Sequence, residues 1–355
     1  MRILIVAPSL NIMGGQAVQA DLLLRNFRRE DVAADFQPHD PVPWWPLNYL
    51  TRIKYLRTVI VSVFYLGGLL QRIPRHDVIH VFSASYLSFL LAPAPAILIA
   101  KLFGKRCILN YRSGEADDHL TRWRRSCHRI IRKADLIVVP SGYLVEIFGR
   151  HGFRAEAIFN ISDFNIFKFR DRASVAPRVL VARNLEPLYD IETALRAFAR
   201  FRDRYPQATI KIVGSGSDEK HLRRLVAEER IAGVTFTGRV EREAMARLFD
   251  EADIFLNASV IDNMPVAIIE AFYCGLPVVT TNAGGIPYVV RDRENGLLCA
   301  MRDDDALAQA LVTVMEDSQL RAAIIAGGRA DAARFSWEQV REQWAGVYLK
   351  VLGRT

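Results

Sequence analysis

Residues 261–287 have the sequence IDNMPVAIIEAFYCGLPVVTTNAGGIP, and this stretch shows how the chain is built. The run VAIIEAFYC has a helical pattern, and Gly275 follows it as a typical helix terminator. The short apolar run at 277–281 is typical of a buried strand, and a paired glycine at 284–285 comes directly after it. A helix that leads into an apolar strand is the repeating pattern of a parallel α/β sheet.

The same alternation continues along the whole chain. Amphipathic helical patterns, for example 190–205 and 218–230, separate short runs that are apolar nearly throughout. The predicted strands are 3–7, 78–82, 107–111, 136–140 and 157–160 in a first series, and 178–182, 209–214, 234–238, 254–258 and 277–281 in a second. Apolar strands of this kind predict parallel sheets covered on both faces, so we expect an α/β fold of two doubly wound domains.

The domain boundary is expected near 161–176, where the periodicity is lost and the sequence becomes polar. This gives a first domain over 1–165 and a second over 166–337. The last helical pattern, about 338–355, is expected to pack back on the first domain. Open parallel sheets bind ligands at the carboxyl ends of their strands, so we expect the two sheets to face a central cleft.

Composition places the chain among folded globular proteins, with 51% hydrophobic and 24% charged residues over 355 positions. Its four cysteines have no metal-binding spacing and are interpreted as free thiols of a reducing compartment. The first apolar run is too short for a signal peptide. We therefore expect a cytoplasmic protein.

Charge is concentrated between residues 41 and 134, where fifteen Lys or Arg stand against four acids. The net charge of that span is therefore +11, whereas the whole chain has a net charge of +8, so the rest of the chain has −3. Apolar blocks lie between the basic residues, and none reaches the roughly 18 to 20 unbroken apolar residues of a spanning helix. The pattern predicts peripheral contact with an anionic membrane at the inner face of the cell membrane, and the alternative is a set of buried helices. No nucleic-acid-binding motif accompanies the charge.

Two carboxylates flank a predicted helix start in the opening stretch. Asp262 comes before the helix, which is expected to begin at Asn263 or Met264 with Pro265 in its first position. Glu270 lies about five residues into it, or roughly 7 Å along the axis. A helix N-terminus favours phosphate, so this arrangement fits a nucleotide-sugar with one carboxylate on the sugar and the other on the ribose.

The second half of the chain resembles the retaining GT-B glycosyltransferases of group 1, glycosyltransferase family 4. The resemblance rests on the two acids, then EAFYCGLPVV (270–279), then Gly284-Gly285. Further matches are 182–198, 211–222, 236–259, NGLL (295–298) and FSW (335–337), in the family's order. The first half matches more loosely, through Gly14-Gly15, DVIHVF (77–82), KADLIVVPS (133–141) and Asn160 with Asp163.

The resemblance implies a role for each matching residue. Glu270 would bind the ribose hydroxyls of the donor, Asp262 would contact the transferring sugar, and Arg183 would neutralise the donor pyrophosphate. The backbone of the donor site would come from a further set: Gly14, Gly15, Gly214, Gly216, Asn263, Met264, Pro265 and Val266. No metal or cofactor is implied, since the nucleotide-diphosphate sugar is itself a substrate.

Other interpretations of these residues remain open. Asp262 could cap the helix, Glu270 could be a solvated surface acid, Arg183 could form a structural salt bridge, and Gly14-Gly15 could be a simple turn. Asp303-Asp304-Asp305 contains the D-x-D of metal-dependent transferases but precedes a helical pattern, so we interpret it as a helix cap.

Three positions depart from the family pattern. Leu188 stands where a lysine usually follows the arginine by five residues, and Tyr288 stands where the paired glycine is commonly followed by I-P-E. Tyr111-Arg112 occupy the place of a frequent histidine. Tyr111 and Arg112 are therefore candidate acceptor or phosphate contacts. Arg112 could substitute for the lysine that is missing at position 188.

The resemblance implies a hexosyltransferase that moves a sugar to a hydroxyl acceptor, here a lipid-linked or polysaccharide acceptor of cell-surface glycan synthesis. Two alternatives share the architecture. A non-hydrolysing sugar-nucleotide epimerase would need a dedicated acid–base set, which the sequence does not show. A non-catalytic nucleotide-sugar-binding partner of a transferase complex would explain Leu188 and the absent histidine.

Overall fold

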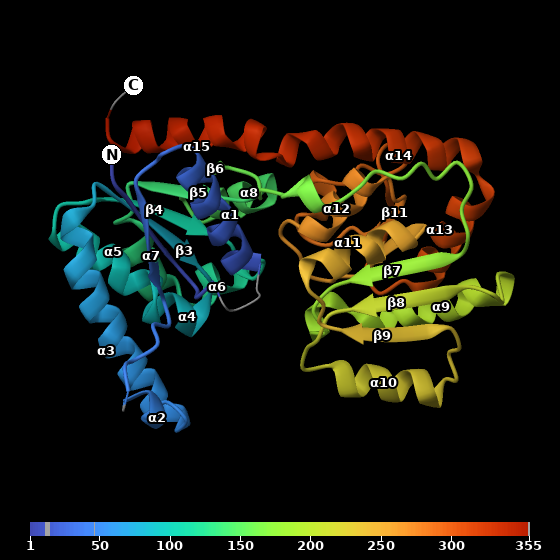
Figure 1. Cartoon of the computed structure of the whole chain (residues 1–355), viewed down its shortest axis with the longest axis horizontal. Coiled ribbons are helices and arrows are strands. Elements are labelled where there is room, and N and C mark those ends of the chain that lie inside the picture. The colour runs from blue at the N-terminus through green and yellow to red at the C-terminus, as the bar shows by residue number, and fades with distance from the viewer. Residues whose placement is uncertain (11–14, 46, 354–355) are drawn as a thin grey trace. The chain divides into compact units, whose positions relative to one another are not determined.

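The chain forms two compact units in a computed structural model that describes residues 1–10, 15–45 and 47–353. Unit 1 comprises Met1–Ile161 with Val340–Thr355, and unit 2 comprises Ser162–Gln339. Each unit has one parallel six-stranded sheet with helices around it (Figure 1). The predicted α/β fold of two doubly wound domains is confirmed.

Unit 1 is built on a sheet of order β2-β1-β3-β4-β5-β6. Its strands are β1 (Ile3–Ala7), β2 (Ala34–Pro38), β3 (Val78–Ser83), β4 (Arg106–Tyr111), β5 (Leu136–Val139) and β6 (Ala155–Ala157). Its helices are α1 (Gly15–Arg29), α2 (Leu47–Leu50), α3 (Lys54–Arg72), α4 (Tyr86–Leu91), α5 (Pro93–Leu102), α6 (Ala116–Arg122), α7 (Arg124–Ile131), α8 (Gly142–Arg150) and most of α15 (Trp337–Val351). The chain reverses direction across the sheet between β1 and β3, which is its topological switch point.

The last helix, α15, is tied to the centre of this sheet. The buried ring of His80 on β3 forms a 2.6 Å hydrogen bond through Nδ1 with the Tyr348 hydroxyl of α15. The same ring packs on Trp344, with 4.8 Å between ring centroids. Burial lowers the pKa of His80 to about 3, so the imidazole is neutral and serves packing.

Unit 2 has the sheet order β12-β11-β10-β7-β8-β9. Its strands are β7 (Arg178–Ala182), β8 (Thr209–Val213), β9 (Val234–Gly238), β10 (Ile254–Asn257), β11 (Val278–Thr281) and β12 (Leu297–Cys299). Its helices are α9 (Ile191–Arg204), α10 (Glu219–Glu228), α11 (Arg242–Glu251), α12 (Val266–Cys274), α13 (Asp304–Glu316) and α14 (Ser318–Ala332). Here the switch point lies between β7 and β10, the neighbours from which the strand order runs outward.

Three predictions about strands were wrong, and all three concern sheet edges. β2 and β12 were missed, and the strand predicted at 157–160 is β6, at Ala155–Ala157. Strands in the middle of a sheet are covered on both faces and are therefore apolar throughout. β2, ADFQP, is only partly buried and lacks the apolar run on which the prediction depends.

Helix α12 begins two or three residues later than predicted. Pro265 is its N-cap, with φ −75° and ψ 102°, and Val266 is its first residue. The extended ψ of Pro265 excludes it from the first helical position. The predicted end is confirmed, since Gly275 adopts φ +74° after Cys274. Asp303 caps α13 as predicted and accepts a 2.8 Å hydrogen bond from Ala306 N–H.

Candidate active site

The polar residues of unit 2 gather at its topological switch point. Arg183 directly follows β7, and Asn257 ends the neighbouring β10, so both lie at the carboxyl edge of the sheet. Ser259 and Asp262 continue from β10 toward α12. Ligands of open α/β sheets bind at this edge, where loops on the two sides of the switch point diverge.

Arg183 is the centre of this group. Its Nε donates to Asn257 Oδ1 at 3.1 Å, and an Nη donates to Ser259 Oγ at 3.4 Å. The same guanidinium forms an ion pair with Asp262 and lies over the Tyr189 ring, 4.4 Å from its centroid. The side chain of Arg183 is 12% exposed and that of Asp262 8%. Burial lowers the pKa of Arg183, but the group remains a cation.

Asp262 holds the loop before α12 rather than the helix itself. Its Oδ1 accepts a 2.8 Å hydrogen bond from Asn263 N–H, and its carbonyl accepts one of 2.8 Å from Gly285 N–H. The N-cap of α12 is Pro265, without a side-chain hydrogen bond. The helix-cap alternative for Asp262 is therefore wrong, whereas Arg183 does form a salt bridge, with Asp262.

Glu270 is a carboxylate without a direct partner among the described residues. It lies on α12, half-buried, and makes no hydrogen bond or ion pair within the part of the chain that the structure describes. Removal from water raises its pKa to about 7, more than the charge of Arg242 lowers it, while Asp163 adds to the rise. An unpaired, partly desolvated carboxylate is available for ligand hydroxyls.

The glycines near the site allow its loops to pack closely. A Cβ on Gly214, at φ +137°, would lie 2.0 Å from Arg183 O, and one on Gly216 would lie 2.1 Å from Leu185 O. On the other side of the switch point, a Cβ on Gly285 would lie 1.9 Å from Asn263 O. Backbone packing therefore accounts for these glycines. Contact of Gly214 and Gly216 with a nucleotide stays a prediction.

The start of α12 carries the four predicted donor-binding positions 263–266. Asn263 and Met264 are buried, and Pro265 leads into the first turn. First-turn N–H groups of a helix have no intrahelical partner, so this end suits an anion. Contact with a donor stays a prediction for all four residues.

In unit 1 the predicted contacts lie near the switch point between β1 and β3. Gly15 opens α1 with open space at its Cβ position, and Gly14 lies outside the described residues. Gln16 Nε2 donates to Ser83 O at 3.3 Å, and Arg112 N–H donates to the same carbonyl at 3.0 Å. The first turn of α1 and the end of β4 thus converge on the end of β3.

Of the two residues at the end of β4, Arg112 is the better placed for a ligand. The Tyr111 hydroxyl is buried and bonded to Ser85 Oγ at 2.7 Å and His119 Nδ1 at 2.8 Å. Arg112 is half-buried and donates to the Asn110 and Asn160 amide oxygens. Burial lowers its pKa to about 9, and no carboxylate within the described ranges forms an ion pair with it.

Two site residues, Asn257 and Ser259, were missed by the sequence analysis. They orient Arg183, and Asn257 Nδ2 also donates to Thr280 Oγ1 at 2.9 Å on β11. The available signal was polarity: the apolar strand IFL ends in N-A-S, and polar residues at the carboxyl end of a parallel strand point to a site.

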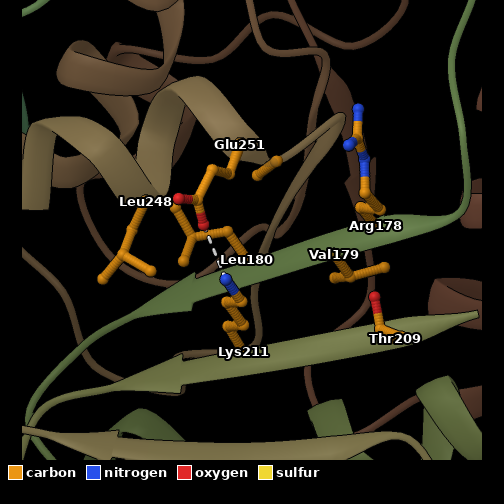
Figure 2. A pocket seen from close by; sticks show the side chains of 8 residues that line it. Arg178, Val179, Leu180, Thr209, Lys211, Leu248 and Glu251 are labelled. Atoms are coloured by element: carbon orange, nitrogen blue, oxygen red, sulfur yellow. Dashed lines mark hydrogen bonds and ion pairs between the residues drawn. The ribbon is translucent and has the colours of Figure 1, made fainter.

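A cavity of about 230 Å³ lies elsewhere on unit 2 and contains none of the predicted residues (Figure 2). It is lined by Arg178, Val179, Leu180, Thr209, Lys211, Leu248, Glu251 and Ala252. Arg178 begins β7, so the cavity extends toward the opposite end of that strand from Arg183. Its cation Lys211 is already paired with Glu251 at 2.6 Å, as the dashed line in Figure 2 shows. The cavity is not the site described above.

Comparison with known proteins finds a family match in the second half of the chain. Residues 163–331 match the family model Glycosyl transferases group 1. Glycogen synthase of Mycobacterium tuberculosis is 28% identical over 298 residues, which cover 78% of this chain and 69% of that protein. D-inositol 3-phosphate glycosyltransferase of a Nocardioides species is 29% identical over 249 residues, covering 62% of this chain and 54% of that protein. These matches support a nucleotide-sugar glycosyltransferase.

Solved structures confirm the predicted GT-B fold. Sucrose-phosphate synthase from Thermosynechococcus elongatus superposes with a TM-score of 0.82 at 21% identity and full coverage of both chains. HepE from Anabaena, solved in complex with UDP, gives 0.76 at 19% identity, covering 99% of this chain and 100% of that one. At these identities the similarity establishes the fold alone.

Proposed function

We propose that the chain is a retaining, metal-independent hexosyltransferase that transfers a sugar from a nucleotide-diphosphate sugar to a hydroxyl acceptor. One observation carries the proposal: Arg183 is held by Asn257, Ser259 and Asp262 at the switch point of unit 2, in the segment that matches the family model. Such a fixed cation can stabilise the charge that grows on a leaving diphosphate without reorganising. The unpaired Glu270 supplies the second contact, to the ribose hydroxyls.

The proposed reaction breaks the bond between the anomeric carbon and the diphosphate oxygen. Arg183 and the first-turn N–H groups of α12 stabilise the negative charge that this oxygen gains. The acceptor hydroxyl attacks from the same face, and its proton passes to the departing oxygen, so the configuration is retained. Asp262 positions Arg183 before the donor arrives and contacts the transferring sugar when it is bound.

UDP-sugars are the first donors to test, because HepE, which has a similar fold, was solved with UDP and with UDP-glucose. The decisive experiment mixes the full chain with UDP-, GDP- and ADP-sugars and candidate acceptors, and measures release of the nucleoside diphosphate. Acceptor-dependent release supports the transferase. Isomerised UDP-sugar without an acceptor would favour the epimerase alternative, and donor binding without turnover would favour the non-catalytic partner.

The acceptor side of the proposal rests on the charge of residues 41–134. We propose a lipid-linked or polysaccharide acceptor in cell-surface glycan synthesis, reached at the inner face of the cell membrane. The net +11 of this span favours an anionic leaflet. Arg112, which forms no ion pair with a carboxylate of the described residues, is the proposed contact for a phosphate of the donor or acceptor.

Glu270→Gln is expected to stabilise the ligand-free protein above pH 7. In the folded protein the pKa of Glu270 is about 7, above its ordinary value of 4.5. Between pH 4.5 and pH 7 the folded state therefore keeps a proton on Glu270 that the unfolded state has already lost. The stability of the parent therefore falls as pH rises from about 4.5 to 7, and that of the glutamine variant does not. Thermal unfolding at pH 5 and pH 8 should show an advantage for the variant only at pH 8.

The same substitution is expected to weaken donor binding about ten- to a hundredfold, because it removes charge-assisted hydrogen bonds. Ribose hydroxyls that donate to Glu270 favour the carboxylate, so binding of UDP-glucose to the parent at pH 7 should release roughly half a proton. Calorimetry in two buffers of different ionisation enthalpy measures this release. Equal release by parent and variant would show that Glu270 does not receive the ribose.

Leu188→Lys is expected to raise turnover or donor affinity about tenfold, since one charge-assisted hydrogen bond contributes about 1.5 to 3 kcal/mol. Val260 and Ile261 N–H donate to Leu188 O at 3.0 and 3.3 Å, which fixes this residue beside the loop that leads to Asp262. The leucine side chain is half-buried, so a lysine stem fits without an unpaired buried charge. Leu188→Gln is the uncharged control, and an equal gain in both variants would contradict an electrostatic role.

A further inference from the structure

An apolar hairpin of unit 1, here called hairpin 42–64, is largely exposed to solvent over its described residues, 42–45 and 47–64. It contains α2 and the first half of α3, which extend away from the sheet of unit 1 (Figure 1). Its exposed large apolar residues are Val42, Trp44, Trp45, Tyr49, Leu50, Ile53, Tyr55, Leu56, Val59 and Val63. Trp45 and Tyr55 are each 82% exposed. Apolar surface of this density on a soluble unit indicates a partner.

The helix of this hairpin is longer and more apolar than the sequence analysis anticipated. The most apolar 18-residue window of Tyr55–Arg75 has a mean hydropathy of 1.3, so this helix is long and apolar enough to cross a membrane, yet only 17% of that window is buried in the protein. A core helix of this composition would be mostly buried. The exposed half of α3 is therefore not explained by the packing of unit 1.

One face of the second half of α3, in contrast, packs into the core of unit 1 and continues at Ile73, which follows the helix. Tyr65, Leu69 and Ile73 are buried, and the Tyr65 hydroxyl donates to Ala92 O at 2.8 Å. The hairpin is closed just before this point by Trp44 and Phe64, whose ring centroids are 4.7 Å apart. The contacts of α3 with the core thus begin only after residue 64.

The charge around the hairpin has a single sign. Residues 41–76 contain five Lys or Arg and no Asp or Glu. Arg52 and Arg57, both exposed, lie at the connection of α2 and α3 and in the first turn of α3. Cations beside exposed tryptophan and tyrosine match the boundary of an anionic bilayer, where aromatic rings lie at headgroup level.

We propose that hairpin 42–64 inserts into one leaflet of an anionic bilayer and lies at its interface without spanning it. This deepens the membrane contact of the proposed function and rests on it only for the inner leaflet as the target. The free part of α3, about ten residues, extends roughly 15 Å. Even an end-on helix of this length would cross only about half of a hydrocarbon core of roughly 30 Å, and the core packing of Tyr65 and Leu69 prevents deeper entry, so the hairpin cannot span the bilayer.

The test measures binding of the full chain to vesicles of phosphatidylcholine with and without 30% phosphatidylglycerol. Val59→Asp/Val63→Asp changes two residues that are 60% and 61% exposed, so folding should be unaffected. Vesicle binding should fall at least tenfold, because carboxylates would enter the apolar boundary. Leu87→Asp/Leu102→Asp is the control, because it adds the same charge on α4 and α5 at residues that are 58% and 77% exposed. Its vesicle binding should stay within twofold of the parent if only the hairpin inserts.

Two further measurements test charge and depth. Arg52→Gln should weaken binding to the anionic vesicles about fivefold, since one cation near such a surface contributes about 1 kcal/mol. Lipids brominated near the headgroup should quench the fluorescence of Trp44 and Trp45 more than lipids brominated at the chain ends. Trp44→Phe/Trp45→Phe should remove that quenching. Stronger quenching from the chain ends would overturn interfacial placement.

Equal vesicle binding by Val59→Asp/Val63→Asp and the parent would overturn the inference. So would a parent dimer in sedimentation that the variant converts to a monomer, because the hairpin would then be a protein interface. UDP-glucose binding, measured on the same preparations, separates the two proposals. If the parent binds none of the UDP-, GDP- and ADP-sugars while vesicle binding is intact, the transferase is contradicted and the membrane hairpin stands.

Discussion

Arg183→Ala is expected to lower acceptor-dependent nucleotide release by about a hundred- to a thousandfold, the usual effect of removing one preorganised group that stabilises transition-state charge. It is also expected to destabilise the protein by about 3 kcal/mol. The reason is that Asp262, 8% exposed, would remain as a buried carboxylate without its cation. Turnover under saturating donor and urea unfolding measure the two effects.

A second substitution separates the two effects. In Arg183→Ala/Asp262→Asn the buried charge is removed together with its partner, so most of the lost stability should return. Turnover should stay low, because no cation faces the diphosphate. Recovery of turnover together with stability would contradict the proposed role of Arg183 and show that the pair is purely structural.

The sequence was sufficient for the interior of each sheet, because strands covered on both faces are apolar at every position. β1 and β7, which lie inside their sheets, were predicted with their observed bounds, and so was β9 at the edge of the second sheet. Edge strands carry a weaker signal, and β2 and β12 were therefore missed. The exposure of α3 could not be predicted either, since apolar periodicity indicates a buried face without showing whether the protein itself covers it.

For the site, the sequence pattern identified residues but not their pairings. Arg183 and Asp262 are 79 positions apart, and only the adjacency of β7 and β10 brings them together. Asn257 and Ser259 orient Arg183 through side-chain hydrogen bonds that no local spacing encodes. Gly214 and Gly216 were predicted as contacts for a nucleotide, whereas the structure shows that the closeness of neighbouring backbone already requires them, as it does Gly285.

That requirement leads to the second large effect, expected for Gly285→Ala. The new Cβ would lie 1.9 Å from Asn263 O, a contact that only a shift of backbone can relieve. The same loop donates Gly285 N–H to Asp262 O at 2.8 Å. Relief should therefore displace the segment that holds Asp262 and the start of α12. We expect a destabilisation of about 3 kcal/mol, at the upper end of overpacking effects, and a loss of donor affinity of at least a hundredfold.

Gly346→Ala is the matched control for this prediction. Gly346 lies within α15, and no atom lies within 4 Å of its Cβ position, so alanine should stabilise the protein by about 0.5 to 1 kcal/mol and leave UDP-glucose affinity unchanged. Calorimetric titration and urea unfolding of both variants provide the comparison. If Gly285→Ala loses stability but binds UDP-glucose as tightly as the parent, the displaced loop does not carry the donor site. The assignment of Asp262 and positions 263–266 to donor binding would then be wrong.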